Sequence, residues 1–276
     1  MIPSKKYPAK VMLFGEYAIL SGGKALSVPY SNLATWWSDQ HSTIGNKIPH
    51  EILRTLEKHC ASNPKITGKM DVAAFLSSLN NDEELRTNIP IGYGLGSSGS
   101  VVAAVFDRFA YNQEFTTELL LEILGSMEGV FHGKSSGVDP LVSYLNEGVL
   151  VDNQEVNTIN TKATIPYSFY DTGVSRSTAH LVEIFKERMR DQEFESIIKE
   201  KYLPLVDDGI TAWLNKDKDA SWKTIKKLSA FQLEYFNFAI PASVKPVWEA
   251  MLQKEESVLK LCGAGGGGYM LSFTPQ

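Results

Sequence analysis

The chain has 276 residues, with 27 basic and 32 acidic side chains, a net charge of −5 and 43% hydrophobic residues. This length and apolar content suffice for a substantial core, which we expect to be divided between two domains. The composition excludes intrinsic disorder. The mildly acidic balance without a basic stripe argues against a protein that binds nucleic acid through its phosphates.

The sequence also predicts the cellular environment. Cys60 and Cys262 are too few for a disulfide scaffold, so a reducing compartment is expected. No stretch approaches the roughly 18 to 20 apolar residues that span a bilayer. The apolar run near the amino terminus meets Gly15 and Glu16 instead of forming a secretory signal. We therefore expect a soluble, cytoplasmic protein without a membrane partner.

The spacing of apolar residues alternates between two and about 3.6, which is typical of a mixed α and β protein. In chain order, strands are predicted over residues 9–14, 24–28, 31–40, 148–151, 168–171, 258–262 and 269–273. Helices are predicted over 49–59, 71–79, from just after Ser98, over 116–131, around 181–185 with Ser177 or Thr178 as cap, and around 228–235. A boundary near residue 160 separates the predicted domains.

Residues 90–99 (PIGYGLGSSG) form a glycine-rich segment before a predicted helix. Glycines allow backbone amides to approach a ligand closely, and the amino-terminal end of a helix attracts anions, so phosphate is the natural occupant. The hydroxyls of Ser97 and Ser98 could bind phosphate oxygens or Mg2+. The alternative is a tight loop in which Ser98 caps the helix.

Two common motifs match this segment in letters but fail in context. Residues 94–99 fit the dinucleotide pattern G-x-G-x-x-G, which requires an acid about 20 residues later at the end of a strand. Glu118 and Glu122 lie on a helical pattern instead. Residues 94–99 also resemble the start of a P-loop, but Ser100 stands where that motif requires lysine.

Two acids flank a second glycine-containing stretch. Glu128 borders the apolar stripe of its predicted helix, where a carboxylate is costly unless it is paired or holds a metal. Asp139 follows the turn at residues 132–138 (HGKSSGV) and could face a cleft. A metal-binding Glu beside a proton-accepting Asp would suit phosphoryl transfer. A solvated acid and a turn-capping Asp are the alternative.

Two further segments remain. Lys10 and Glu16 bracket an apolar strand, and such a lysine could stabilise an anion or form a surface ion pair. Residues 263–268 (GAGGGG) contain more glycine than a hairpin needs, which indicates close approach to a ligand or a flexible hairpin.

Taken together and in this order, the motifs resemble those of the GHMP kinases. The matching segments are residues 10–17 (KVMLFGEY), 90–98 and 263–268. Residues 128–143 and 171–178 (DTGVSRST) are most similar to mevalonate kinases. The resemblance implies an α+β, two-domain GHMP kinase fold. Its amino-terminal ATP-binding domain (1–160) would contain a left-handed β-α-β unit, its carboxyl-terminal domain (161–276) would be ferredoxin-like, and the active site would lie between them.

The resemblance also implies roles for individual residues. Asp139 would accept the proton of the substrate hydroxyl, Lys10 would lower the pKa of that hydroxyl, and Glu128 and Ser98 would hold Mg2+. The residues implied for ATP are Gly94, Leu95, Gly96, Ser97 and Ser98 around the phosphates, with Gly265, Gly266 and Gly267 closing over the site. The residues implied for the substrate are Glu16, Arg176 and Thr178, with Arg176 binding a carboxylate.

The implied activity is the ATP- and Mg2+-dependent phosphorylation of the primary hydroxyl of mevalonate, which yields 5-phosphomevalonate. Phosphomevalonate kinase or another GHMP small-molecule kinase is the alternative, and a homodimer is compatible with the sequence. Some residues depart from the family pattern. Gly99 and Ser100 replace the usual alanines, Ser175 replaces a common proline, and Tyr17 replaces the histidine of mevalonate kinases, as in phosphomevalonate kinases.

Two readings from other classes remain open. Residues 133–137 (GKSSG) match the hydrolase nucleophile motif G-x-S-x-G, with Ser135 as nucleophile and Asp171 and His180 in the required order. That motif needs a strand before it, whereas a helix is predicted here. A regulator that binds nucleotide without turnover is the other reading, but such a protein would not require Lys10, Glu128 and Asp139 together.

Overall fold

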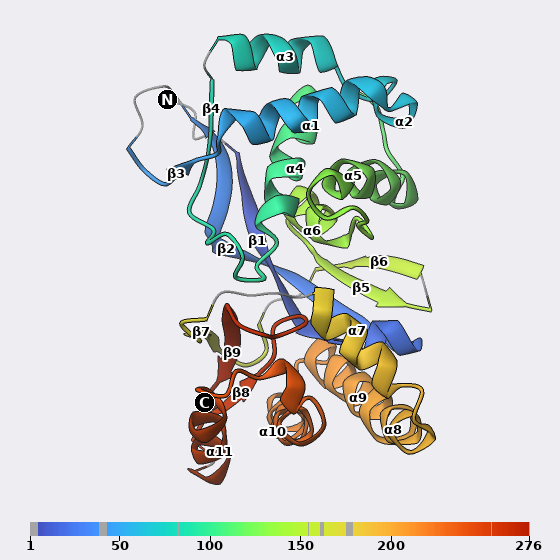
Figure 1. The fold of residues 1–276 in the computed structure, drawn as a ribbon, viewed down its shortest axis with the longest axis vertical. Helices are drawn as coiled ribbons and strands as arrows, with labels where there is room; N and C mark the ends of the chain where they lie inside the picture. Colours follow the sequence, from blue (N-terminus) through green and yellow to red (C-terminus); the bar gives the residue numbers. More distant parts are fainter. Residues whose placement is uncertain are drawn as a thin grey trace. The chain divides into compact units, whose positions relative to one another are not determined.

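The computed structural model describes residues 5–38, 43–81, 83–153, 155–160, 163–174, 179–254 and 256–275. These residues form a mixed helix and strand fold, as predicted (Figure 1). The chain divides into two compact units. The first comprises Met1–Lys10, Val28–Ile91 and Leu95–Val149, and the second comprises Val11–Ser27, Gly92–Gly94 and Leu150–Gln276. The domain boundary near residue 160 stays a prediction.

The larger sheet contains the strands that precede residue 160. They are β1 (Lys6–Phe14), β2 (Ala25–Ser38), β3 (Asn46–Lys47), β4 (Glu84–Thr87), β5 (Gly148–Asp152) and β6 (Glu155–Ile159). Their order is β3-β4-β2-β5-β6, and β1 also pairs with β2. Strands β2 and β4 are antiparallel, with Thr35 opposite Thr87. The two strands predicted over 24–28 and 31–40 are one strand, because Pro29 between them is compatible with an extended backbone.

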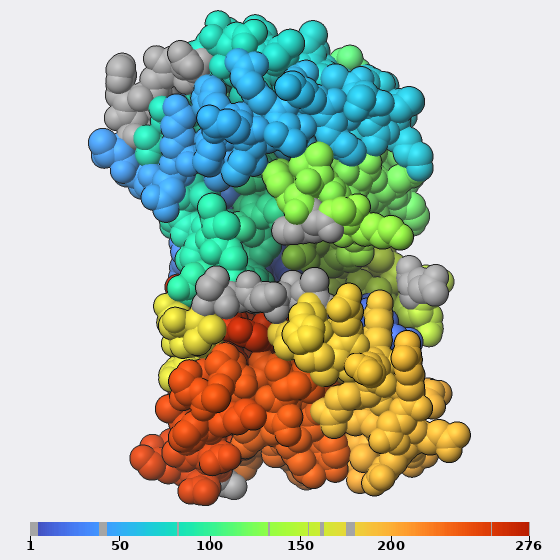
Figure 2. Space-filling model, in the orientation of Figure 1, coloured from blue at the N-terminus to red at the C-terminus, as the bar shows by residue number. Residues whose placement is uncertain are grey.

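The first unit contains six helices among the described residues. They are α1 (His50–Ser62), α2 (Pro64–Thr67), α3 (Val72–Asn80), α4 (Ser97–Phe109), α5 (Thr117–His132) and α6 (Val138–Leu145). Most residues of α4 are buried. Helices α1 and α5 lie side by side on one face of this unit, in blue and green (Figure 2). Thr116 caps α5 by accepting a hydrogen bond from the Leu119 amide. Helix α6 is absent from the sequence-based prediction.

The second unit is built on a small antiparallel sheet. Its strands are β7 (Tyr167–Asp171), β8 (Val258–Lys260) and β9 (Tyr269–Phe273), in the order β7-β9-β8. Its helices are α7 (Ala179–Arg188), α8 (Gln192–Ile197), α9 (Leu203–Leu214), α10 (Lys218–Tyr235) and α11 (Lys245–Lys254), with a π-helical segment, Ile198–Tyr202, between α8 and α9. Short 3-10 turns lie at Ala18–Ser21 and Asn237–Ala239. Helices α8, α9 and α11 were not predicted.

Within the described part of the chain, no helix combines the length and the apolar character needed to cross a membrane. Cys60 and Cys262 are both buried, and neither forms a disulfide bond.

Candidate active site

A buried lysine and a partly exposed carboxylate meet in the first unit. Lys10 lies in β1 and is only 5% exposed. Its Nζ is 2.8 Å from Oδ1 of Asp139, whose side chain is one third exposed. Asp139 is the second residue of α6, so the acid expected after a glycine-rich turn stands in the first turn of a helix. The pair combines a charge shielded from water with a carboxylate that a small molecule can reach.

Glycines allow the surrounding backbone to come this close. Gly137 precedes α6 with φ +78°, and a Cβ there would lie 2.3 Å from the Leu121 carbonyl oxygen of α5. Gly96 has φ +67°, and a Cβ there would lie 3.2 Å from Cβ of Lys10. The Lys10 amide also donates to the Leu95 carbonyl at 2.9 Å. The start of α4 therefore lies against the Lys10–Asp139 pair.

The amino-terminal end of α4 is suited to an anion. Gly92, Gly94 and Gly96 all have positive φ angles, which side chains rarely adopt. Gly96 is the N-cap residue and offers no side chain to the first amides of the helix. Amides at such a position point outward and, with the helix dipole, favour phosphate. The alternative in which Ser98 caps the helix is wrong, because Ser98 is the second residue of α4.

Glu128 projects from α5 and is held by two serines. Ser98 Oγ donates to Glu128 Oε1 at 2.8 Å, and Ser135 Oγ donates to Oε2 at 2.5 Å. Glu128 is only 4% exposed. Burial raises the pKa of Glu128, and the nearby charge of Asp139 raises it further, while the two serines and Lys10 act in the opposite direction. The carboxylate is thus a buried charge that lacks full compensation.

These residues fit a magnesium ion. Carboxylate and hydroxyl oxygens are the donors that a hard cation prefers, and a cation beside Glu128 would compensate its buried charge. Among the described residues, no group of three or more His, Cys, Asp or Glu side chains could hold a metal. The fit is therefore to an ion that takes its other ligands from phosphate oxygens and water, as Mg2+ commonly does.

The remaining predicted residues belong to other parts of the structure. Glu16 lies in the second unit, where its buried carboxylate pairs with Lys260. Gly265, Gly266 and Gly267 lie in the same unit and have positive φ angles. Arg176 and Thr178 lie outside the described residues, as do the predicted helix caps at Ser177 and Thr178.

Ser135 is a site residue that sequence reasoning did not assign to this cluster. It entered only as the nucleophile of a hydrolase. The hydrolase reading is wrong, because helix α5 precedes Ser135 and its hydroxyl donates to Glu128. The Gly137 amide donates to Ser135 Oγ at 3.0 Å and orients it. The only sequence feature that could have assigned Ser135 to this site is its place in the glycine-containing stretch between Glu128 and Asp139.

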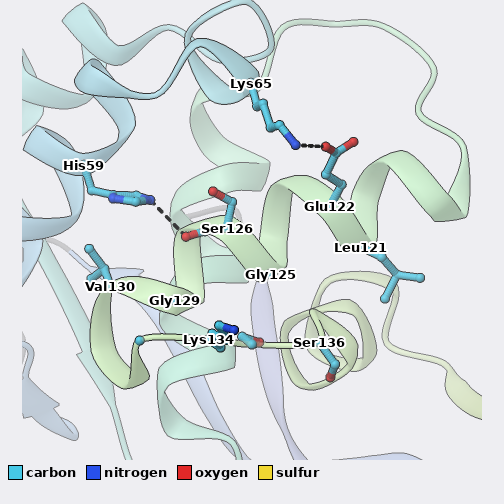
Figure 3. Close-up of a pocket in the computed structure, with 12 residues that line it drawn as sticks. His59, Lys65, Leu121, Glu122, Gly125, Ser126, Gly129, Val130, Lys134 and Ser136 are labelled. Carbon is cyan, nitrogen blue, oxygen red and sulfur yellow. Dashed lines mark hydrogen bonds and ion pairs between the residues drawn. The ribbon is translucent and has the colours of Figure 1, made fainter.

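A separate groove of about 680 Å³ borders the same loop. It lies between α5, residues from α1 and α2, and the loop that follows α5 (Figure 3). His59 Nε2 lies 2.9 Å from the Ser126 carbonyl oxygen, and Lys65 pairs with Glu122. Lys10, Glu128 and Asp139 are not among its lining residues, whereas Ser135, which donates to Glu128, lines it.

Comparison with known proteins identifies relatives along almost the whole chain. Residues 80–147 match the family model described as the GHMP kinases N terminal domain. The mevalonate kinase of Pyrococcus abyssi is 28% identical over 295 residues, which cover 97% of this chain and 87% of that protein. The mevalonate kinase of Archaeoglobus fulgidus is 28% identical over 278 residues, covering 96% and 90%.

Solved structures share the fold. The L. major mevalonate kinase in complex with R-mevalonate has a TM-score of 0.69 at 16% identity, and the match covers 100% of this chain and 88% of that one. The Streptococcus pneumoniae phosphomevalonate kinase has a TM-score of 0.67 at 18% identity, covering 98% of this chain and 91% of that one. The resemblance to the GHMP kinases, and among them to mevalonate kinases, that the motifs indicated is thus confirmed.

Proposed function

We propose that this protein transfers the γ-phosphoryl group of ATP to the primary hydroxyl of mevalonate, giving 5-phosphomevalonate and ADP. The relatives named mevalonate kinase support the substrate. The contact between Lys10 Nζ and Asp139 Oδ1 is the observation that carries the reaction type. A reachable carboxylate beside a shielded ammonium group is what the activation of an alcohol requires.

In the proposed reaction, the Asp139 carboxylate accepts the proton of the substrate hydroxyl. The Lys10 ammonium stabilises the negative charge that develops on the hydroxyl oxygen. That oxygen forms a bond to the γ-phosphorus of ATP while the bond between this phosphorus and the bridging oxygen breaks. The electrons of the broken bond remain on ADP, and the proton remains on Asp139 until water removes it.

We assign ATP binding to the start of α4. The amides that follow Gly96 would hold the phosphate oxygens, and Ser97 would add a hydroxyl. Glu128 and Ser98 would hold Mg2+, which supplies compensation for the charge of the phosphates when it is bound. Ser135 would keep the Glu128 carboxylate in one orientation.

Other assignments rest on the sequence resemblance alone. They are phosphate binding by Gly94 and Leu95, closure by Gly265, Gly266 and Gly267, and substrate contacts by Glu16, Arg176 and Thr178. The side chain of Leu95 is buried, so its contribution would come from the backbone. A cytoplasmic location and a homodimer also stay predictions.

The test is a coupled assay of ADP release with ATP, Mg2+ and one acceptor at a time. We expect turnover with mevalonate and none above background with homoserine or galactose. Turnover with phosphomevalonate alone would instead support the phosphomevalonate kinase reading. Nucleotide binding without turnover on any of these acceptors would support the non-catalytic reading.

A further inference from the structure

A buried ion pair lies at the base of the glycine loop, residues 263–268, in the second unit. Glu16 is 2% exposed, and Lys260, the last residue of β8, has no exposed surface. Their charged groups are in direct contact. Burial raises the pKa of Glu16, while Lys260 lowers it. Moving two charges out of water is costly, so the pair is not explained by stability alone.

This pair is bonded to the backbone at the start of the glycine loop. Lys260 Nζ donates to the Leu261 carbonyl oxygen at 2.8 Å. The backbone of Gly263 also lowers the pKa of the Glu16 carboxyl group. Gln232 donates through Nε2 to Glu16 Oε2 at 3.4 Å and accepts through Oε1 from the Leu261 amide at 2.9 Å. The side chains around Glu16 therefore determine the path of the chain as it leaves β8.

Tyr17, the residue after Glu16, holds the next part of the loop. Its hydroxyl donates to the Ala264 carbonyl oxygen at 2.6 Å. Its ring stacks on Phe185, with ring centroids 4.8 Å apart, which fixes the direction of the hydroxyl. Two consecutive residues of the segment 10–17 thus support the glycine loop, although most of the chain lies between that segment and the loop.

The other end of the loop is held as well. A Cβ at Gly268 would lie 2.8 Å from Cα of Tyr93, and the Tyr269 amide donates to the Tyr93 carbonyl at 3.4 Å. Thr172 donates to the Gly268 carbonyl through its amide at 3.1 Å and through its hydroxyl at 2.8 Å. The loop therefore packs against the segment 92–94, which leads directly into the phosphate-binding segment proposed above.

The loop cannot hold this conformation by itself. Gly263, Gly265, Gly266, Gly267 and Gly268 all have positive φ angles, and glycine has the largest backbone freedom of any residue. Its conformation must therefore come from the groups that hold its two ends. A buried pair of this kind can specify one arrangement among several of similar stability.

We propose that Glu16 and Lys260, with Tyr17, are positioning residues that set the conformation in which the glycine loop binds the phosphates of the nucleotide. Glu16 then acts through the loop, and this role replaces the substrate contact that the sequence resemblance implies for it. The inference rests on the proposed function only for the identity of the nucleotide. The effect of these residues on the loop can be measured by hydrogen exchange and nucleotide binding, without any turnover.

The test uses Glu16→Gln, Lys260→Met and Tyr17→Phe in the full-length protein. Hydrogen exchange is measured for the amides of residues 261–268, together with the Kd for a fluorescent ATP analogue and the kinetics with ATP and mevalonate. We expect exchange in this segment to accelerate about tenfold, as the loss of one charged hydrogen bond allows. The Kd and the KM for ATP should rise severalfold, while the KM for mevalonate stays unchanged.

The matched control is Ser229→Ala. Ser229 lies on α10, as Gln232 does, and its buried hydroxyl accepts a 2.8 Å hydrogen bond from Trp248 Nε1. This variant should lower the melting temperature without changing exchange at residues 261–268 or the affinity for nucleotide. Tyr17→Phe keeps the stacking on Phe185, so it should fold even where the charge variants do not.

Unchanged exchange in the loop of folded Tyr17→Phe and Glu16→Gln would overturn the proposal, as would faster exchange with an unchanged Kd for nucleotide. If the wild-type protein shows no turnover with mevalonate but the variants still bind nucleotide with a higher Kd, the positioning role is supported and the proposed acceptor is refuted. The two failures are therefore distinguishable.

Discussion

Lys10 Nζ lies 2.8 Å from Asp139 Oδ1, with the lysine on a buried strand and the acid on the first turn of a helix. The two side chains differ in their exposure to solvent, and this difference gives them different roles. The ammonium group cannot reach solvent easily, so it acts on the carboxylate and on any oxygen bound beside it. The carboxylate is open on one side and can exchange protons with a substrate.

Asp139→Asn tests the assignment of the base. The amide cannot accept the proton, so kcat should fall by about 10² to 10⁴, while the Kd for ATP changes little. Steady-state kinetics and a nucleotide-binding titration measure the two effects. Asp107→Asn is the control, because that acid bonds to Tyr7 and Lys5 instead. A near-wild-type kcat for Asp139→Asn would remove the assignment.

Glu128→Gln should separate stability from activity. The pKa of Glu128 is raised above its ordinary value of 4.5 in the folded protein, so the folded state loses stability as pH rises from the ordinary value through the raised one. A neutral glutamine side chain avoids this loss. The variant should melt about 2 to 4 °C above wild type at pH 7, and the gap should close below about pH 4. Its kcat should fall by about 10².

The measurement is thermal unfolding between pH 4 and pH 8 without nucleotide or Mg2+. A variant that melts below wild type at neutral pH would show that the Glu128 carboxylate is fully compensated in the folded protein.

Ser135→Ala should weaken metal binding more than catalysis. It removes the donor to Glu128 Oε2, which raises the pKa of the carboxylate further and frees its orientation. The Mg2+ concentration for half-maximal velocity should rise about tenfold, the scale of one hydrogen bond to a charged group. Ser126→Ala, on the same helix but bonded to Asn63, should leave this concentration unchanged. Equal Mg2+ dependence in both variants would rule out the role of Ser135.

Gly96→Ala and Gly92→Ala form a pair that isolates crowding from backbone strain. Both glycines have positive φ angles, so alanine costs about 1 to 2 kcal/mol at either position. At Gly96 the new Cβ would also lie 3.2 Å from Lys10 Cβ and 3.5 Å from Asp139 Oδ2, whereas nothing lies within 4 Å at Gly92. We expect kcat/KM for ATP to fall at least about tenfold more in Gly96→Ala, the effect of roughly 1.4 kcal/mol. Equal losses would contradict this expectation.

The long elements could be predicted because their periodicity is strong. Val102, Val105, Phe106 and Phe109 recur at helical spacing and are all buried in α4. Helix α6 could not be predicted in this way, since its eight residues are too few for periodicity to distinguish a helix from a turn. The charged run at 215–219 (NKDKD) contains Asp217, which caps α10 by accepting a hydrogen bond from the Ala220 amide at 2.9 Å.

The composition of the site was predictable, but its pairings were not. Lys10, Glu128 and Asp139 were assigned from motifs that carry local signals. The contacts of Ser135 with Glu128 and of Lys260 with Glu16 join residues through tertiary structure, and neither pair has a spacing that marks it. A buried lysine on an otherwise apolar strand such as β8 was the one clue to the second pair.

The crowding at residue 99 limits how this chain can exchange parts with its relatives. A Cβ on Gly99 would lie 2.8 Å from the Pro140 nitrogen and 2.9 Å from the Asp139 carbonyl carbon. Ser100 is buried and shares a 2.7 Å hydrogen bond with Thr35. A chimera that imports the usual alanines would displace the proposed base through residue 99 and leave Thr35 without this hydroxyl partner at residue 100. A segment exchanged with a relative should therefore include α4, α6 and the strand β2 together.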